Sequence, residues 1–415
     1  MLSLYNLSIR LYFFLIYIVS FFNQKARLWL NGRSVQQVTK SGPSIWFHFA
    51  SLGEFEQGRP VLEQMRNLHP SKKIVVTFFS PSGYEIRKNT PLADHVYYLP
   101  LDTKYNARDF INAIQPELAI FTKYEYWYHY FNELNKQHIP LYIISGIFRP
   151  NQVFFKWYGS LYRKMLTFVT HFFVQDKQSV ELLKGVGITN VTVSGDTRFD
   201  RVWANAQQPK NLPIIAGFTG ESKLFVAGST WPQDEELIAK LITQYPDWKF
   251  IIAQHEIGEE KINKLISLLP ENSVIRFSNL TPIAIKAQTL IIDNIGMLSS
   301  LYQYGHIAYI GGGFGAGIHN TLEAAAFGLP VIFGPNYERF KEAKDLISLH
   351  AGFSIGNEEE LKQAAGKLIS DQLFYVDAST AIKKYVEEHV GATETIIEHI
   401  TVATRVKNKD SRIKT

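Results

Sequence analysis

From Ser44 onward, short apolar runs alternate with segments that carry a helical pattern of apolar residues. We predict strands at 45–50, 74–79, 96–99, 118–122, 141–145, 172–175 and 191–193, and in the second half at 224–227, 250–253, 274–277, 290–293, 307–310 and 331–333. The helical segments between them are 54–68, 104–114, 125–136 and 177–184, then 234–242, 259–268, 298–304, 320–327, 340–349 and 358–369. Alternating strands and helices predict an α/β fold with parallel sheets covered by helices.

The alternation is interrupted at residues 203–222, which contain two Pro and two Gly and show no clear periodicity. We interpret this stretch as a linker between two Rossmann-like domains, residues 41–202 and 223–404. Parallel sheets bind ligands at the carboxyl ends of their strands, so we expect the two domains to face each other across a cleft.

The N-terminus carries an almost unbroken apolar run at residues 11–22. As a helix it spans about 18 Å, which is short of the roughly 30 Å hydrocarbon core of a bilayer. An extension back to Leu2 is interrupted by Asn6 and Arg10. Three interpretations stay open: a helix lying in one leaflet, a strained spanning helix, and a signal peptide, for which Ser20-Phe21-Phe22 is a poor cleavage site.

The charge distribution supports a membrane surface as partner. The net charge of the 415 residues is +5. Residues 1–40 contain only basic charges, and the tail 405–415 is also basic, so the body between them is slightly acidic. These ends suit an anionic membrane, whereas the body does not suit nucleic acid. Basic residues such as Lys25 and Arg27 after the apolar run predict that the body stays on the cytoplasmic side.

Composition excludes several kinds of chemistry. The chain has no cysteine, so it has no disulfide, no thiol nucleophile and no thiolate metal site. The histidines show neither an HExxH motif nor a close His-x-His spacing, and we expect no metal site and no cofactor.

A turn that contains Ser51, Gly53 and Glu54 follows the first predicted strand and leads into a helix. An acid in the first turn of a helix interacts favourably with the helix dipole, and that alone is a sufficient structural explanation. The alternative is that Glu54 is a general base at the mouth of the cleft.

A second motif, residues 311–323, has five glycines in its first seven positions and ends at Asn320 and Glu323. Asn-x-x-Glu is typical of a capped helix, but a cap needs no glycine-rich segment before it. Glycines allow close approach of the backbone, so we interpret the segment as a phosphate or nucleotide site. The spacing is neither that of a P-loop nor that of a Rossmann fingerprint.

Four further loops that follow predicted strands carry polar residues: 228–230, 253–256, 293–297 and 195–200. Each has an ordinary structural explanation when it is taken alone. The three loops of the second half, with the glycine-rich segment, predict a ligand site at one sheet edge, while 195–200 closes the first half. Arg198 is a candidate clamp for a phosphate or carboxylate, with a surface ion pair to Asp200 as the alternative.

These motifs, in this order, resemble the 3-deoxy-D-manno-octulosonic acid (Kdo) transferases of lipopolysaccharide assembly. The resemblance extends from the N-terminal apolar segment to about Asp345, and no single motif carries it. The motifs that carry it are 51–54 with Arg59-Pro60, 77–83, 124–127, 195–200, 227–230, and most specifically 319–328 with 330–335. The resemblance implies a GT-B fold, two Rossmann-like domains facing across a cleft, with an N-terminal membrane-anchor helix in residues 1–40.

The resemblance also implies roles for individual residues. Glu54 matches the catalytic base, and Glu125 and Arg198 match positions that support the transition state. The implied CMP-binding positions are Gln254, His255, Ile295, Gly296, Met297, Asn320, Thr321, Leu322 and Glu323.

The chain departs from the family pattern at several positions. Met297 replaces a common Glu, Gln254 a common Arg, Arg198 a common Lys and Lys123 a common acid. We interpret these differences as variation in how CMP is held, because Glu54, Asn320 and Glu323 are present.

The activity implied is inverting transfer of Kdo from CMP-Kdo to the lipid A precursor at the cytoplasmic face of the inner membrane. Glu54 would take the proton of the attacking hydroxyl. Two alternatives stay open: a GT-B enzyme that uses a UDP-sugar and another acceptor, and a membrane-associated binding protein without activity.

Overall fold

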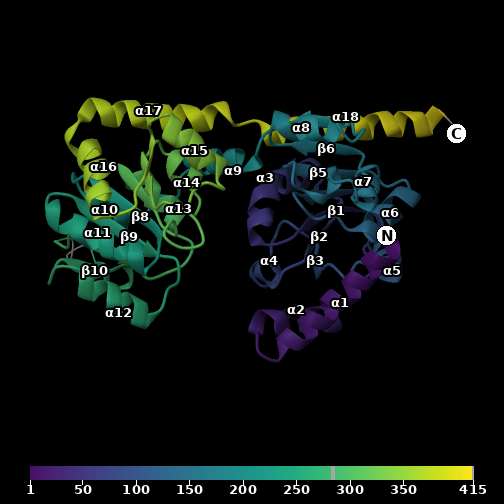
Figure 1. Ribbon diagram of the computed structural model, residues 1–415, viewed down its shortest axis with the longest axis horizontal. Coiled ribbons are helices and arrows are strands. Elements are labelled where there is room, and N and C mark those ends of the chain that lie inside the picture. Colours follow the sequence, from purple (N-terminus) through teal and green to yellow (C-terminus); the bar gives the residue numbers. More distant parts are fainter. Residues whose placement is uncertain (282–285, 414–415) are drawn as a thin grey trace. The chain divides into compact units, whose positions relative to one another are not determined.

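The computed structural model describes residues 1–281 and 286–413, with side chains described up to residue 402 outside that gap. The predicted basic tail, residues 405–415, therefore has its side chains outside the described part. The chain divides into two units, residues 1–201 with 390–415, and residues 202–389, and each is described by itself. Figure 1 shows the helices and strands of both units.

Unit 1 contains a parallel seven-stranded sheet in the order β3-β2-β1-β4-β5-β6-β7. Its strands are β1 (Ser44–Phe49), β2 (Lys73–Phe78), β3 (His95–Tyr98), β4 (Pro116–Thr122), β5 (Leu141–Gly146), β6 (His171–Val174) and β7 (Val191–Val193). The helices are α3 (Leu52–Leu68), α4 (Pro81–Arg87), α5 (Lys104–Ile114), α6 (Tyr128–Lys136), α7 (Ser160–Leu166), α8 (Lys177–Lys184), α9 (Thr197–Gln207) and α18 (Ala392–Ile413), with a 3₁₀ turn at Val153–Phe155.

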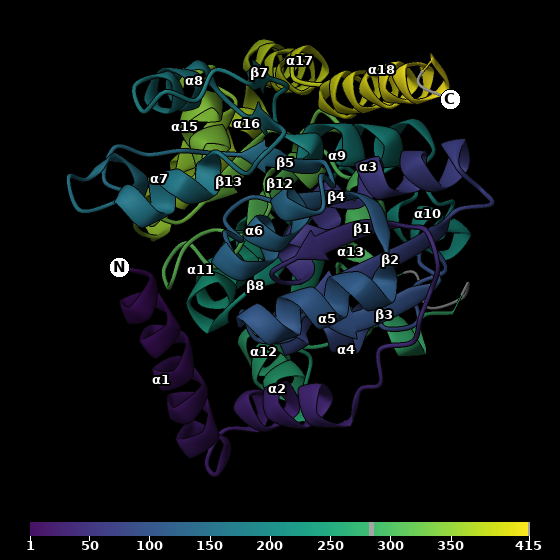
Figure 2. The same ribbon diagram turned by 90° about the vertical axis from the view of Figure 1, so that its right-hand side faces the viewer.

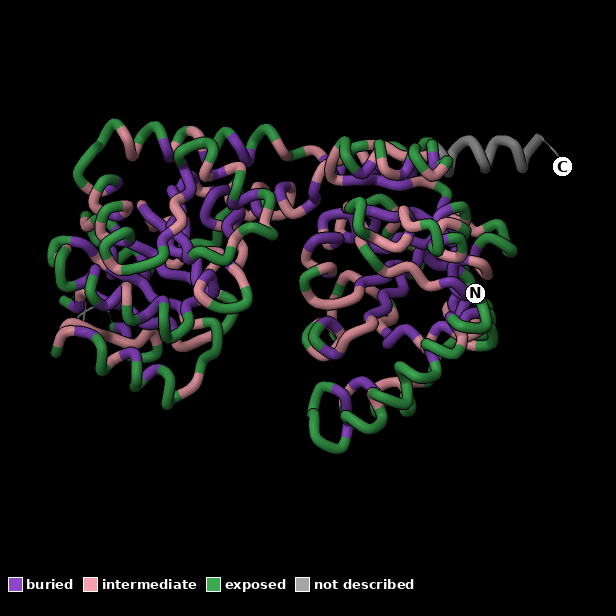
Figure 3. Tube along the Cα trace, in the orientation of Figure 1, coloured by how far each residue is buried: buried purple, intermediate pink, exposed green. Residues whose placement is uncertain are grey.

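The core of unit 1 consists of two clusters, one on each face of this sheet. Side chains alternate along β1, so Trp46 joins one cluster while Phe47 and Phe49 join the other. The first cluster is closed by α5, α6 and α7. The second is closed by α3 and by the apolar face of α18, which contributes Ile396 and Ile400. Every residue of β1 is buried, as expected for the centre of a parallel sheet (Figure 3).

Unit 2 contains a second parallel seven-stranded sheet, in the order β10-β11-β9-β8-β12-β13-β14. The strands are β8 (Leu224–Thr230), β9 (Lys249–Gln254), β10 (Val274–Arg276), β11 (Thr289–Ile292), β12 (Ile307–Ile310), β13 (Val331–Phe333) and β14 (Gly352–Ser354). The helices are α10 (Pro213–Thr219), α11 (Pro232–Gln244), α12 (Glu259–Leu268), α13 (Leu298–Leu301), α14 (Leu322–Ala325), α15 (Lys341–Ser348), α16 (Glu358–Ser370) and α17 (Gln372–Glu388), with 3₁₀ turns at Phe277–Asn279 and Tyr302–Tyr304.

Two N-terminal helices of unit 1, α1 (Leu2–Ser20) and α2 (Gln24–Val35), contact each other and lie beside the rest of the unit (Figure 2). By length and composition α1 is able to cross a membrane, and it is almost entirely exposed (Figure 3). Its few buried residues include Tyr5, whose hydroxyl donates to Asp102 at 2.5 Å. Arg33 of α2 donates to the carbonyls of Phe79 and Leu99 at 2.7 and 2.9 Å. These contacts tie the helix pair to loops at the carboxyl ends of β2 and β3.

The structure differs from the predicted domain organisation in two places. The predicted linker, residues 203–222, holds the end of α9 and all of α10. Residues 390–404, predicted to belong to the second domain, group with unit 1. The cause is the Asp200 carboxylate, which accepts from the backbone N–H of Gly391 and Thr393 and from the Thr393 hydroxyl, at 2.6–2.7 Å. This contact holds the start of α18 on α9, and the apolar face of α18 then completes the unit 1 core.

Candidate functional site

In unit 1, Glu54 lies in the first turn of α3, directly after the carboxyl end of β1. Ser51 is the N-cap residue, but its side chain does not cap the backbone. Its hydroxyl donates instead to Glu54 Oε2. The turn thus orients the carboxylate by one of its oxygens and leaves the side chain partly accessible, as a general base requires.

Glu125 follows β4, the strand that pairs with β1, so the two acids emerge at the same edge of the sheet. The predicted helix at 125–136 begins only at Tyr128, and Glu125 lies in the loop before it. The Trp127 indole donates to Glu125 Oε2 at 3.1 Å, and His48 Nε2 lies 3.3 Å from the same oxygen. Glu125 is therefore held in place by two ring nitrogens.

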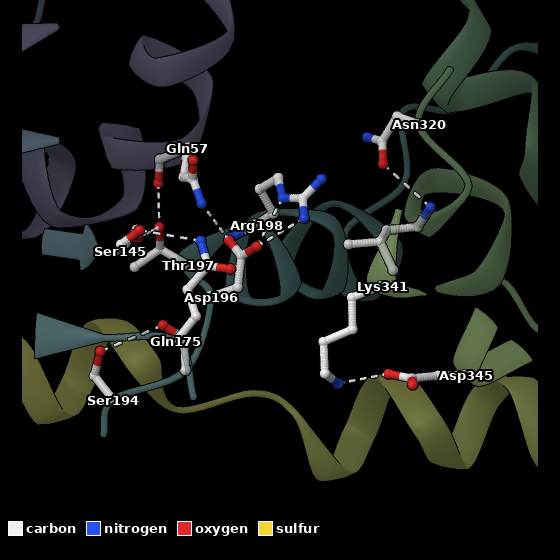
Figure 4. Close-up of polar contacts among 12 residues, drawn as sticks. Gln57, Ser145, Gln175, Ser194, Asp196, Thr197, Arg198, Asn320, Lys341 and Asp345 are labelled. Atoms are coloured by element: carbon white, nitrogen blue, oxygen red, sulfur yellow. Dashed lines mark hydrogen bonds and ion pairs between the residues drawn. The ribbon is translucent and has the colours of Figure 1, made fainter. Parts of the chain in front are cut away.

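Arg198 pairs with Asp196 and not with Asp200. Its Nε and backbone N–H donate to the two oxygens of Asp196 at 2.8 and 2.9 Å. Asp196 also accepts from Gln57 of α3 at 2.6 Å, and Figure 4 shows it between Gln57 and Arg198. Burial by itself raises the pKa of Asp196, but the charge and hydrogen bonds of Arg198, with Lys123, lower it overall. The ion pair with Asp196 thus holds the Arg198 side chain in the first turn of α9.

In unit 2, the loops after β8 and β9 form a polar network. Glu235 is buried, and it accepts from the Thr230 hydroxyl and from Gln254 Nε2 at 3.0 Å each. Its pKa is raised because burial outweighs these hydrogen bonds. Gln254, where the family commonly has Arg, is therefore engaged with a neighbouring side chain. The same loops line a small pocket that also includes Trp231 and Lys261.

His255, Trp231 and His319 form a stack of three rings at this edge. The His255 ring lies 4.9 Å from that of Trp231 and 4.3 Å from that of His319, and both pairs are nearly parallel. The Trp231 indole donates to His319 Nε2 at 3.2 Å. Burial, and then the charge of nearby His255, lowers the pKa of His319 to about 4, so His319 is neutral at pH 7.

The loop after β11 presents Ile295 and Gly296 to solvent, with Ile295 92% exposed. Gly296 has a φ of +92°, a conformation that favours glycine. Asn294 Nδ2 contacts Met297 Sδ at 2.9 Å, which closes the turn before α13. Met297 thus has a structural partner at the position where a carboxylate is common in the family.

The glycine-rich segment follows β12 and packs closely against its neighbours. A Cβ on Gly311 would come within 2.2 Å of the Ser229 carbonyl oxygen, and one on Gly313 within 2.6 Å of the Gly334 backbone. Gly315, in contrast, has no such neighbour closer than 3.7 Å, and it is exposed. Close backbone packing therefore explains Gly311 and Gly313, whereas Gly315 lies where a ligand has access.

The predicted helix at 320–327 is reduced to the four residues of α14, Leu322–Ala325. Asn320 Oδ1 accepts from the Leu322 N–H, and its Nδ2 donates to Glu323, both at 3.1 Å. Thr321 is fully buried, and its hydroxyl has no hydrogen-bond partner. Gln254 Oε1 and Asn294 Oδ1 are also buried without a partner. These three atoms lie at the end of β9 and in the loops after β11 and β12, and each is inaccessible in the folded unit.

The structure therefore places the predicted residues in two groups, one for each unit: Glu54, Glu125 and Arg198 in unit 1, and Gln254, His255, Ile295, Gly296, Met297, Asn320, Thr321, Leu322 and Glu323 in unit 2. Their roles stay predictions. Within residues 1–281 and 286–402, no cluster of three or more His, Asp or Glu has the arrangement of a metal site.

Sequence reasoning missed several residues that shape these groups. His48 lies inside β1 and reaches Glu125 only in the folded chain. Two of these residues could have been found from their positions in the sequence. Gln57 lies one turn after Glu54 on α3, and Trp231 directly follows the 228–230 motif. His319 lay within the glycine motif, but its ring contacts come from two other loops.

Comparison with known proteins agrees with this arrangement. Residues 23–201 match the family model described as 3-deoxy-D-manno-octulosonic-acid transferase (kdotransferase). The 3-deoxy-D-manno-octulosonic acid transferase of Aquifex aeolicus is 27% identical over 79% of this chain and 86% of its own. That of Chlamydophila psittaci is 29% identical over 76% of this chain and 75% of its own. A bifunctional glycosyltransferase/methyltransferase of Fusobacterium nucleatum is 24% identical over 89% of this chain, which spans 59% of that protein's length.

Solved structures agree on the fold. UDP-GlcNAc 2-epimerase from Neisseria meningitidis superposes with a TM-score of 0.60 at 16% identity, covering 86% of this chain and 99% of that one. MurG from Acinetobacter baumannii gives a TM-score of 0.53 at 10% identity, with the same coverage. Together with the two parallel sheets, these likenesses confirm the predicted GT-B fold.

Proposed function

We propose that this glycosyltransferase, whose residues 23–201 belong to the Kdo transferase family, transfers Kdo from CMP-Kdo to the lipid A precursor in lipopolysaccharide synthesis. The observation that carries the proposal is the pair of acids in the matched region. Glu54 and Glu125 follow the adjacent strands β1 and β4, each oriented by hydrogen bonds to a single oxygen. Unit 2 supplies the strand-end loops that carry the positions predicted for the nucleotide, among them the hydrogen-bonded pair Asn320 and Glu323.

The chemistry follows from these groups. Glu54 takes the proton of a primary hydroxyl of the acceptor, and that oxygen attacks the anomeric carbon of Kdo. The bond from this carbon to the phosphate oxygen of CMP breaks, and CMP leaves with the bonding electron pair. Attack opposite the leaving group inverts the configuration. Glu125 supplies negative charge near the positive charge that develops on the sugar. Arg198 supports the same transition state as a clamp for a phosphate or carboxylate group.

Unit 2 would hold the donor. Asn320 and Glu323 form a hydrogen-bonded pair suited to the ribose or base of CMP. His255, with one face covered by neighbouring rings, and the exposed turn at Ile295 and Gly296 complete the proposed nucleotide contacts. We expect no metal requirement, so a chelator such as EDTA leaves the rate unchanged.

The exposed apolar face of α1 would bind the inner membrane and hold the enzyme on its cytoplasmic side. Arg10, Lys25 and Arg27 lie on α1 and α2 without an acid in the first 40 residues, which suits anionic lipid head groups. The acceptor is itself an anionic lipid, so membrane attachment brings enzyme and acceptor together.

The donor nucleotide tests the proposal directly. Addition of CMP is expected to raise the melting temperature of the purified protein, because a ligand that binds only the folded state stabilises it. UDP serves as the matched control. A shift with UDP and none with CMP would overturn the proposed donor and favour the UDP-sugar alternative.

A further inference from the structure

His48 is a fully buried histidine in β1, an inner strand of the unit 1 sheet, and it contacts a proposed functional carboxylate. Its Nδ1 lies 2.8 Å from the Thr77 hydroxyl of β2, and its Nε2 lies 3.3 Å from Glu125 Oε2. The ring also packs against Phe121, with ring centres 4.7 Å apart. An apolar residue would fill this core position as well, so the polar contacts call for an explanation of their own.

The hydrogen atoms of this network can be assigned from its partners. The Trp46 indole donates to the Thr77 oxygen at 2.9 Å, so Thr77 acts as an acceptor there. The single Thr77 hydroxyl hydrogen then has two possible acceptors, His48 Nδ1 at 2.8 Å and the Phe47 carbonyl at 3.3 Å. An ionised carboxylate only accepts, so the contact with Glu125 Oε2 requires a hydrogen on His48 Nε2, and in the neutral ring Nδ1 is then the acceptor for Thr77. A neutral ring that accepts at Nδ1 carries its hydrogen at Nε2, which faces the carboxylate.

Glu125 Oε2 consequently receives two N–H groups, one from His48 and one from Trp127. Trp127 stacks on Phe79, with ring centres 4.9 Å apart and an interplanar angle of 29°. Within the residues whose side chains are described, no hydrogen bond reaches Glu125 Oε1, and the side chain keeps 15% of its surface exposed. One oxygen is anchored to the protein, and the other is left for a ligand.

We propose that His48 is a positioning residue, which acts as a neutral Nε2–H donor and, with Trp127, fixes Glu125 so that Oε1 faces the reacting sugar. The inference rests on the proposed function, since it requires Glu125 to act in Kdo transfer. His48 does not touch substrate, and its effect on the reaction passes through Glu125. The Trp46–Thr77–His48 chain sets the ring tautomer in the way that outer residues orient the ligands of metal sites.

Two variants separate positioning from packing. In His48→Gln the amide nitrogen reaches the place of Nε2 and retains the donor to Glu125. In His48→Asn the shorter amide retains the contact with Thr77 and leaves Glu125 without this donor. Both replace a buried ring by an amide, so each is the packing control of the other.

We expect His48→Asn to lower kcat for Kdo transfer by about 10- to 100-fold, because small displacements of a reacting group have effects of this size. The KM for CMP-Kdo and CMP binding stay unchanged, and His48→Gln restores most of kcat. Trp127→Phe, which removes the second donor, is expected to act like His48→Asn. Equal loss in the Gln and Asn variants, with both folded, would overturn the proposal, as would a normal kcat in His48→Asn.

A measurement on the unmodified protein does not depend on how the variants fold. Nitrogen NMR of ¹⁵N-histidine-labelled protein is expected to show His48 as a neutral ring protonated at Nε2. An imidazolium or an Nδ1–H ring would contradict the assignment.

The failure of the proposed function is distinguishable from the failure of this inference. A wild-type protein that transfers no Kdo refutes the function. An active wild type whose Glu125→Gln variant is equally active leaves the function standing and refutes the role given to Glu125 and His48.

Discussion

Asp102 is a buried carboxylate that connects α1 to the start of α6, and its ionisation predicts how stability depends on pH. It accepts from the Tyr5 hydroxyl and from the backbone N–H groups of His129 and Tyr130. The last two lie at the N-terminus of α6, where backbone N–H groups have no partner within the helix and Trp127 provides no side-chain cap. Asp102 therefore caps the helix that directly follows the Glu125 loop.

Burial raises the pKa of Asp102 to about 6 from its usual 3.8, although the hydrogen bonds from Tyr5, His129 and Tyr130 lower it. Because the folded state holds the proton more tightly, this group stabilises the fold fully below pH 3.8, and the contribution disappears as pH rises through 6. The difference, 6 − 3.8, corresponds to about 3 kcal/mol at 1.36 kcal/mol per pH unit. Most of this, about 2 kcal/mol, falls between pH 4 and 7.5.

Asp102→Asn removes the ionisation and serves as the reference. The free energy of unfolding of both proteins is measured by urea titration in a nonionic detergent at several pH values between 4 and 7.5. The wild type is expected to lose about 2 kcal/mol relative to Asp102→Asn over this range, with equal m-values. A constant difference would refute the reasoning. A wild type that gains stability with rising pH would show that the N–H donors outweigh burial.

Two further predictions concern packing. Asp200→Ala removes three hydrogen bonds at the start of α18 and is expected to destabilise unit 1 by about 2 kcal/mol, as measured by urea unfolding; an unchanged midpoint would contradict the assigned cap. Gly313→Ala places a Cβ within 2.6 Å of the Gly334 backbone, so we expect it to lower the melting temperature and weaken CMP binding. Gly315→Ala is the control, because its Cβ has no neighbour closer than 3.7 Å and leaves the melting temperature unchanged. Equal melting temperatures for the two variants would be evidence against the close packing of this segment.

The sequence predicted the strands well because buried parallel strands are short apolar runs with clear ends. Of the strands in the described residues, β14 (Gly352–Ser354) was missed, since Phe353 is its only apolar side chain and leaves no apolar run. The error at 203–222 is instructive. Pro213 begins α10, and Gly220, with a φ of +55°, follows its end. Proline at the start of a helix and glycine after its end mark helix boundaries. Because linkers are also rich in proline and glycine, the sequence alone did not distinguish the two.

The site was less predictable, because its contacts join distant parts of the chain. The motifs placed Glu54 and Glu125 at one sheet edge, since the strands before them were recognisable. Neither the 77-residue separation of His48 and Glu125 nor the 139-residue separation of Gln57 and Asp196 leaves a local signal. The membership of α18 in unit 1 likewise depends on Asp200, 191 residues before Gly391.

The most direct test of the account is transfer from freshly generated CMP-Kdo to a tetraacyl lipid A precursor, with wild type and Glu54→Gln assayed side by side. We expect product from the wild type and a transfer rate about 100-fold or more lower in the variant, which is the low end of a general base's usual contribution. The product mass also gives the number of sugars added. No product from a folded, CMP-binding wild type would contradict the proposed reaction, and an equally active Glu54→Gln would contradict the proposed base.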